Sequence, residues 1–76
     1  MNSDAFLRRV AEVLDYPGPI TPGQSLADID VWDSLGRLSV VDLLDELGVT
    51  VDLDALAEIE TTDQLLAMVA SVVHDA

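Results

Sequence analysis

The stretch that decides the fold is DVWDSLGRLSVVDLLDELG, residues 30–48. Its apolar residues recur at steps of three and four positions: Leu35, Leu38, Val41, and Leu44 or Leu47. This spacing is typical of one face of an α-helix, and charged residues occupy positions between them. We therefore predict a helix from Ser34 to Leu47, which Gly48 ends in the left-handed conformation that glycine adopts readily.

A first helix and a long loop are predicted before this stretch. Residues 4–15 carry apolar side chains at helical spacing, with Ser3 or Asn2 as the cap. From residue 15 to residue 33 the prolines and glycines exclude a long continuous helix. We expect apolar side chains to hold this loop to the core: Ile20, Leu26, Ile29, Val31 and Trp32.

Two further helices are predicted after it. Residues 53–58 favour a short helix, because a lone strand would have no partner with which to pair. Thr61 and Gln64 have the spacing of a capping box and begin a last helix that we expect to run to about His74. The predicted fold is all-α, a four-helix bundle of three longer helices and one short helix, with a long first loop.

The length of the chain limits what it can do. A chain of 76 residues can bury one small core, so we predict a single domain over residues 1–76. Half of the residues are hydrophobic and only 4% are aromatic, which favours aliphatic packing between helices. Ser34, His74 and an aspartate would make a poor hydrolytic triad without a pocket or an oxyanion hole, so we expect no enzyme.

The charge is strongly negative, with 3 basic residues against 15 acidic ones and a formal net charge of −12. Such a field repels nucleic acids and anionic membrane surfaces, so we expect neither as a partner. It either speeds encounter with basic proteins or serves solubility alone.

The chain has no cysteine and one histidine, and the acidic loop around Asp30 does not match a calcium-binding EF-hand, so we predict no metal site.

The opening residues 1–10 contain no apolar h-region, so we expect no leader. The longest apolar stretch, residues 65–73, is much shorter than the roughly 20 residues of a membrane span. We therefore expect a cytoplasmic protein, and a monomer.

Ser34 lies where the long loop meets the predicted helix of residues 34–47. It is either a helix cap and nothing more, or a site that carries a phosphate. A phosphodiester on Ser34 would lie over the positive end of the helix, and Arg37, one turn on, would be in reach of a charge-assisted contact.

The motif Asp33-Ser34-Leu35 follows a long loop with prolines and begins the second of four helices in an acidic chain. In this context the whole chain resembles an acyl carrier protein. The resemblance implies that Ser34 is modified with 4'-phosphopantetheine from coenzyme A, and that Asp33 and Leu35 help to present it to a phosphopantetheinyl transferase. It also implies that Asp42, Asp45 and Glu46 bind partner enzymes.

The sequence departs from the fatty-acid carriers near Ser34. Trp32 before the motif, and Gly36 and Arg37 after it, look more like free-standing carriers of specialised pathways such as polyketide or nonribosomal peptide biosynthesis. That resemblance implies a small acyl or aminoacyl thioester, supplied by an adenylating ligase or by an acyltransferase or synthase. Trp32 either anchors the loop or contacts a partner, and Gly36 either adds helix flexibility or permits close approach of the arm or an enzyme.

A second function stays open. An unmodified acidic helical adaptor would bind a basic partner protein through the same second helix, and it would not need Ser34.

Overall fold

The first helix of the computed structural model, α1, spans Ser3–Leu14, and the structure describes residues 1–74. Asn2 is its cap, because the backbone N–H of Ala5 donates to the Asn2 Oδ1 at 2.8 Å. The helix ends at Asp15, whose φ of 56° places it in the left-handed region. The predicted helix over residues 4–15 is confirmed to within one residue at each end.

The long loop contains one short turn of 3₁₀ helix, η1, at Leu26–Asp28. Its apolar side chains are the expected anchors: Ile20, Leu26 and Ile29 are buried, and Val31 and Trp32 are half-buried against the core. The loop therefore lies on the helices along much of its length, as predicted.

Hydrogen bonds also join this loop to the chain that enters the last helix. The N–H of Leu26 donates to the Glu60 carbonyl at 2.8 Å, and the N–H of Thr62 donates to the Gln24 carbonyl at 3.0 Å. The Thr62 hydroxyl donates to the Thr21 carbonyl at 2.6 Å, so this fully buried side chain is satisfied. These bonds fix the loop beside a segment almost forty residues further along the chain.

The second helix, α2, spans Ser34–Glu46, and Leu47 is its C-terminal cap. Gly48 follows with a φ of 86°, so the predicted left-handed stop is confirmed. The short helix α3 spans Leu53–Glu58, which are the predicted bounds.

The last helix, α4, spans Thr62–Met68 and begins with the predicted capping box of Thr61 and Gln64. Its predicted end near His74 is wrong. The chain leaves the helix at Val69, and the N–H of His74 donates to the Met1 carbonyl at 2.8 Å. The β-branched residues after Met68 have low helix propensity, and the turns they form bring the chain back to the N-terminus.

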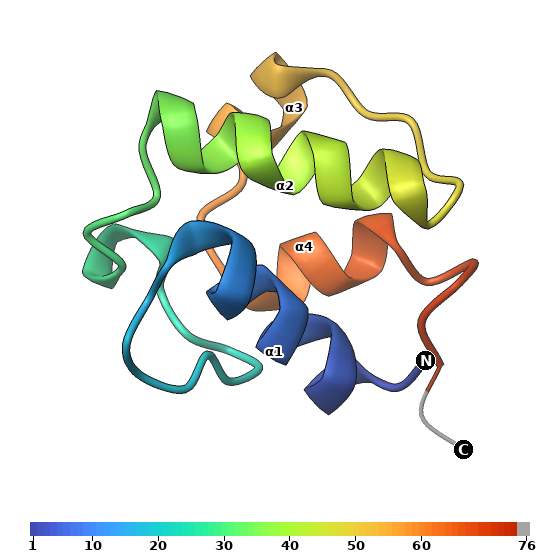
Figure 1. Ribbon diagram of the computed structural model, residues 1–76, viewed down its shortest axis with the longest axis horizontal. Helices are drawn as coiled ribbons and strands as arrows, with labels where there is room; N and C mark the ends of the chain where they lie inside the picture. The colour runs from blue at the N-terminus through green and yellow to red at the C-terminus, as the bar shows by residue number, and fades with distance from the viewer. Residues whose placement is uncertain (75–76) are drawn as a thin grey trace.

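The helices pack around one aliphatic cluster in which Phe6 is the largest buried side chain. Both α1 and α3 pack against α2, and α4 lies on the α1 side of the bundle (Figure 1). The Cα radius of gyration is 11.0 Å, close to the value of about 11 Å for a compact chain of this length. No strand forms within residues 1–74, so the predicted all-α bundle of three longer helices and one short helix is confirmed.

Candidate functional site

Ser34 is the first residue of α2, and it is exposed. The alternative that it caps this helix is wrong, because Asp33 is the cap: the N–H of Gly36 donates to the Asp33 Oδ1 at 2.8 Å. The Ser34 hydroxyl makes no hydrogen bond to any other residue between 1 and 74. Since Asp33 performs the capping, the Ser34 side chain is not engaged at the start of α2.

The approach of the long loop to α2 explains Gly36. A Cβ atom at this position would lie 2.0 Å from the Val31 carbonyl oxygen and 2.8 Å from a methyl carbon of Leu14. Within residues 1–74, the close neighbours of Gly36 are therefore the loop backbone and α1. Glycine here lets the loop pass tightly over the start of the helix and fixes the position of Ser34.

The orientation of α2 differs from the prediction. Its buried residues are Gly36, Val40, Leu43 and Leu44, so of the predicted apolar stripe only Leu44 is fully buried. Leu35 is 77% exposed and Leu38 is 49% exposed. Both apolar sets have helical spacing, and the tight contact of the loop at Gly36 favours the set that includes this glycine.

The opposite side of α2 carries most of the residues that the resemblance singles out. We call it the outward face, and it comprises Ser34, Leu35, Leu38, Asp42, Asp45 and Glu46, all of them exposed. The Glu46 carboxylate lies 3.9 Å from the Arg9 guanidinium, which is closer to Glu12 at 2.7 Å. Within residues 1–74, Asp42 and Asp45 form no ion pair. The outward face thus combines two leucines with a negative end.

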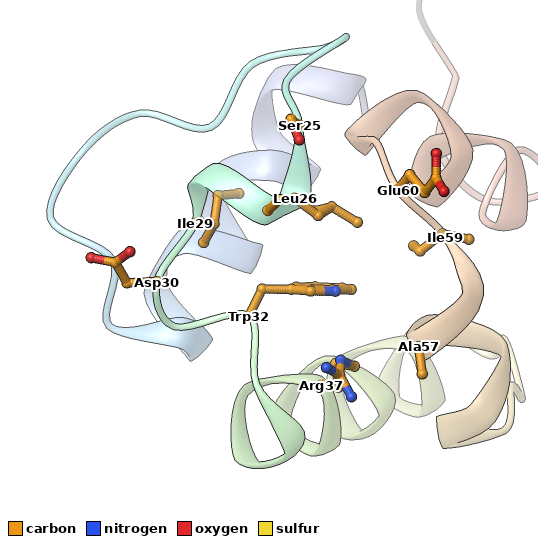
Figure 2. Close-up of a pocket in the computed structure, with 10 residues that line it drawn as sticks. Ser25, Leu26, Ile29, Asp30, Trp32, Arg37, Ala57, Ile59 and Glu60 are labelled. Carbon is orange, nitrogen blue, oxygen red and sulfur yellow. The ribbon is translucent and has the colours of Figure 1, made fainter.

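A groove of about 700 Å³ lies beside the start of α2. Its apolar walls come from η1, from the chain before α2, and from the end of α3 with the connection that follows it. They include Leu26, Ile29, Trp32, Ala57 and Ile59. Figure 2 shows the Trp32 ring between η1 on one side and Arg37 on the other. The hydrogen bonds that join the loop to the start of α4 hold these walls together.

Trp32 and Arg37 both line this groove. Trp32 is half-buried and packs against the core, which matches the predicted role of a loop anchor, and its remaining surface faces the groove. Arg37 is also half-buried; its Nε is shielded from solvent and has no hydrogen-bond partner. No carboxylate of residues 1–74 lies within 4.0 Å of its guanidinium. The predicted contact of Arg37 with a phosphate on Ser34 stays a prediction.

The sequence predicted Ser34 and the acidic residues of α2 as site residues, and it gave no sign of the groove. Ala57, Ile59 and Glu60 carry no motif, and only the folded arrangement brings them to Trp32.

Within the described chain, no group of three or more histidine, cysteine, aspartate or glutamate side chains could hold a metal ion. None of the helices over residues 1–74 is both long enough and apolar enough to cross a membrane.

Comparison with protein-family models, with curated proteins and with solved structures finds no match to this chain.

Proposed function

We propose that this chain is a carrier protein that holds a biosynthetic intermediate as a thioester on a 4'-phosphopantetheine arm attached to Ser34. The observation that carries the proposal is the exposed Ser34 hydroxyl, which has no hydrogen-bond partner within residues 1–74 and lies at the first position of α2. A capping serine would be engaged with the backbone of its own helix. In this chain Asp33 makes the capping hydrogen bond, so capping does not explain a serine at position 34.

The chemistry required of Ser34 is simple. Its Oγ forms a bond to the phosphorus next to the pantetheine of coenzyme A, the pyrophosphate bond breaks, and adenosine 3',5'-bisphosphate leaves. The hydroxyl proton passes to a base of the phosphopantetheinyl transferase. The resulting phosphodiester is stabilised by the partial positive charge at the N-terminus of α2, so the chain needs no catalytic group of its own.

The outward face of α2 supports docking by a succession of enzymes. Leu35 follows Ser34 directly, and Leu38 lies one turn further on, so an apolar pocket of a partner would meet both leucines next to the modified serine. Asp42, Asp45 and Glu46 extend the same face, where they would attract a basic surface. The partners are the transferase and the ligase, acyltransferase or synthase that loads and uses the thiol.

The proposed setting is a specialised biosynthetic pathway in the cytoplasm, in which the carrier works as a monomer. Tethering the intermediate raises its effective concentration at each enzyme, and that is the whole contribution of a carrier to catalysis.

An unmodified acidic adaptor is the competing function, and the exposed Leu35 and Leu38 favour it as well. An adaptor would use the outward face without any change at Ser34. The two functions therefore differ in one observable, the covalent modification of this serine.

The test is to incubate the protein with coenzyme A and a promiscuous phosphopantetheinyl transferase and to measure its intact mass. We expect the wild type to gain one phosphopantetheine and the Ser34→Ala variant to gain none. Ser39→Ala is the matched control on the same helix and should be modified as the wild type is. A wild type that no transferase modifies, with folding verified by circular dichroism, would favour the adaptor.

A further inference from the structure

The three arginines of the chain differ sharply in their surroundings. Arg9 pairs with Glu12 at 2.7 Å, and Arg8 is exposed to water. Arg37 has neither an ion pair nor full exposure to water. It is half-buried, and its Nε has no hydrogen-bond partner. No carboxylate of residues 1–74 lies within 4.0 Å of its guanidinium. An unpaired guanidinium that is partly removed from water costs free energy, and in a chain with 15 acidic residues a partner would have been easy to supply.

The walls around Arg37 define what a ligand would look like. Trp32 and Ile59, both half-buried, offer apolar surface, whereas Arg37 offers several N–H donors and one positive charge. A guanidinium binds a carboxylate more strongly than a neutral acceptor, often through two parallel hydrogen bonds. A ligand with a short apolar chain that ends in a carboxylate would satisfy both parts of the groove.

We propose that the groove binds an acyl group that ends in a carboxylate, with its chain against Trp32 and Ile59 and its carboxylate on Arg37. This inference rests on the proposed function, since the arm on Ser34 would deliver the acyl group. Arg37 lies three residues after Ser34, about 4.5 Å along the helix axis, so the attachment point is next to the groove. The cargo class is then a dicarboxylic acid joined to the arm through one of its carboxyl groups.

Two carboxylates on the rim must be weighed against this proposal. Asp30 and Glu60 are exposed, and Figure 2 shows the Asp30 carboxylate turned away from Trp32 and the Glu60 side chain at the far end of the groove. Water and salt screen exposed charges over about 8 Å at physiological ionic strength. Because Arg37 is partly desolvated and the two carboxylates are exposed, Arg37 therefore dominates the interaction with a ligand carboxylate inside the groove.

The experiment compares two cargoes that differ only at the free end. A promiscuous transferase loads the protein from glutaryl-coenzyme A or from valeryl-coenzyme A, and intact mass verifies each product. The chain has one tryptophan, so Trp32 fluorescence and the side-chain NMR resonances of Trp32 and Arg37 report occupancy of the groove. We expect the glutaryl arm to shift these signals and the valeryl arm to leave them close to those of the unloaded protein.

Variants assign the effect to the charge. In Arg37→Gln the ratio of groove-bound to free glutaryl arm should fall about tenfold, and Arg8→Gln, the matched control on α1, should leave it unchanged. Circular dichroism checks that both variants fold, and the comparison of the two cargoes in the wild type does not depend on any variant. Equal signals from both arms, no signal from either, or full occupancy in a folded Arg37→Gln variant would overturn the proposal.

A failure of the proposed function can be told apart from a failure of this inference. If no transferase modifies Ser34, the proposed carrier function fails. The groove can still be tested, because the chain contains no cysteine. In Ser34→Cys the new thiol is the sole site for a bromoacetamide arm that ends in a carboxylate or, as the control, in a methyl group. Binding of the carboxylate arm alone supports the groove assignment, and equal behaviour of the two arms contradicts it.

Discussion

Both faces of α2 carry leucines, but in opposite environments. The inner face buries Val40, Leu43 and Leu44 against the core, whereas the outward face leaves Leu35 and Leu38 in contact with solvent beside Ser34. Scattered exposed leucines are ordinary on protein surfaces. Two of them lie within four residues of Ser34, and under the proposed function they form part of the surface that docks with a partner enzyme.

Apolar spacing alone therefore does not identify which face of α2 packs against the core. Inner-face residues should matter for stability and little for partner recognition, and outward-face residues should show the reverse.

The largest expected effect comes from removing a buried leucine. Leu44→Ala should lower the free energy of unfolding by about 4 kcal/mol, because it leaves a cavity at a fully buried site. The matched change on the outward face, Leu35→Ala, should alter it by less than about 0.5 kcal/mol while slowing modification by a transferase. Urea denaturation measures both variants, and equal losses of stability would contradict the assignment of the two faces.

Gly36→Ala should cost about 3 kcal/mol. The added methyl group would meet the Val31 carbonyl at 2.0 Å, so the loop or the helix has to move. Gly48→Ala is the control, because no atom lies within 4 Å of its added Cβ and only the positive φ of 86° is strained, at a cost of about 1 kcal/mol. If the midpoints of urea denaturation fall in the opposite order, the close contact at the start of α2 is not what requires glycine.

Reversing the charge of Asp42, Asp45 and Glu46 to lysine should slow loading by a transferase about tenfold at low salt, with the fold intact. The difference should shrink as salt is added, because screening weakens steering. Reversing Asp4, Asp28 and Asp63, which lie off α2, changes the total charge equally and should have a smaller effect. Equal slowing in both triple variants would show that net charge, rather than the outward face, controls loading.

The smallest effect concerns the cap. Asp33→Ala should destabilise the protein by about 1 kcal/mol, because the N–H of Gly36 loses its acceptor. Asp52→Ala removes the residue at the same position of α3, where the side chain makes no cap hydrogen bond, and should cost less. Thermal unfolding followed by circular dichroism ranks the two, and an equal cost would mean that the Asp33 bond contributes little.

Local signals predicted much of the fold. The helix starts followed from side chains that bond within three or four residues, such as Asn2 and the pair Thr61 and Gln64, and the end of α2 followed from Gly48. The end of α4 did not, because the apolar spacing of the predicted helix continues past Met68. After Met68 the chain instead turns back to the N-terminus, where the N–H of His74 donates to the Met1 carbonyl.

The candidate site was predicted in part. Ser34 and the acidic residues of α2 could be proposed from the sequence, because they combine a short motif with an amphipathic context, and their role stays a prediction. The orientation of α2 could not, since two overlapping sets of apolar residues fit a helix equally well and the loop contact at Gly36 decides between them. The groove was missed because Trp32 and Ile59 meet only through the bonds that join the loop to the start of α4.

The most direct test of the central claim is the covalent state of Ser34 in protein purified from the cells that naturally make it. Tandem mass spectrometry of the peptide that contains residues 30–48 should find 4'-phosphopantetheine on Ser34, free or carrying an acyl group. Unmodified Ser34 throughout the sample, or the arm on Ser25 or Ser39 instead, would contradict the account.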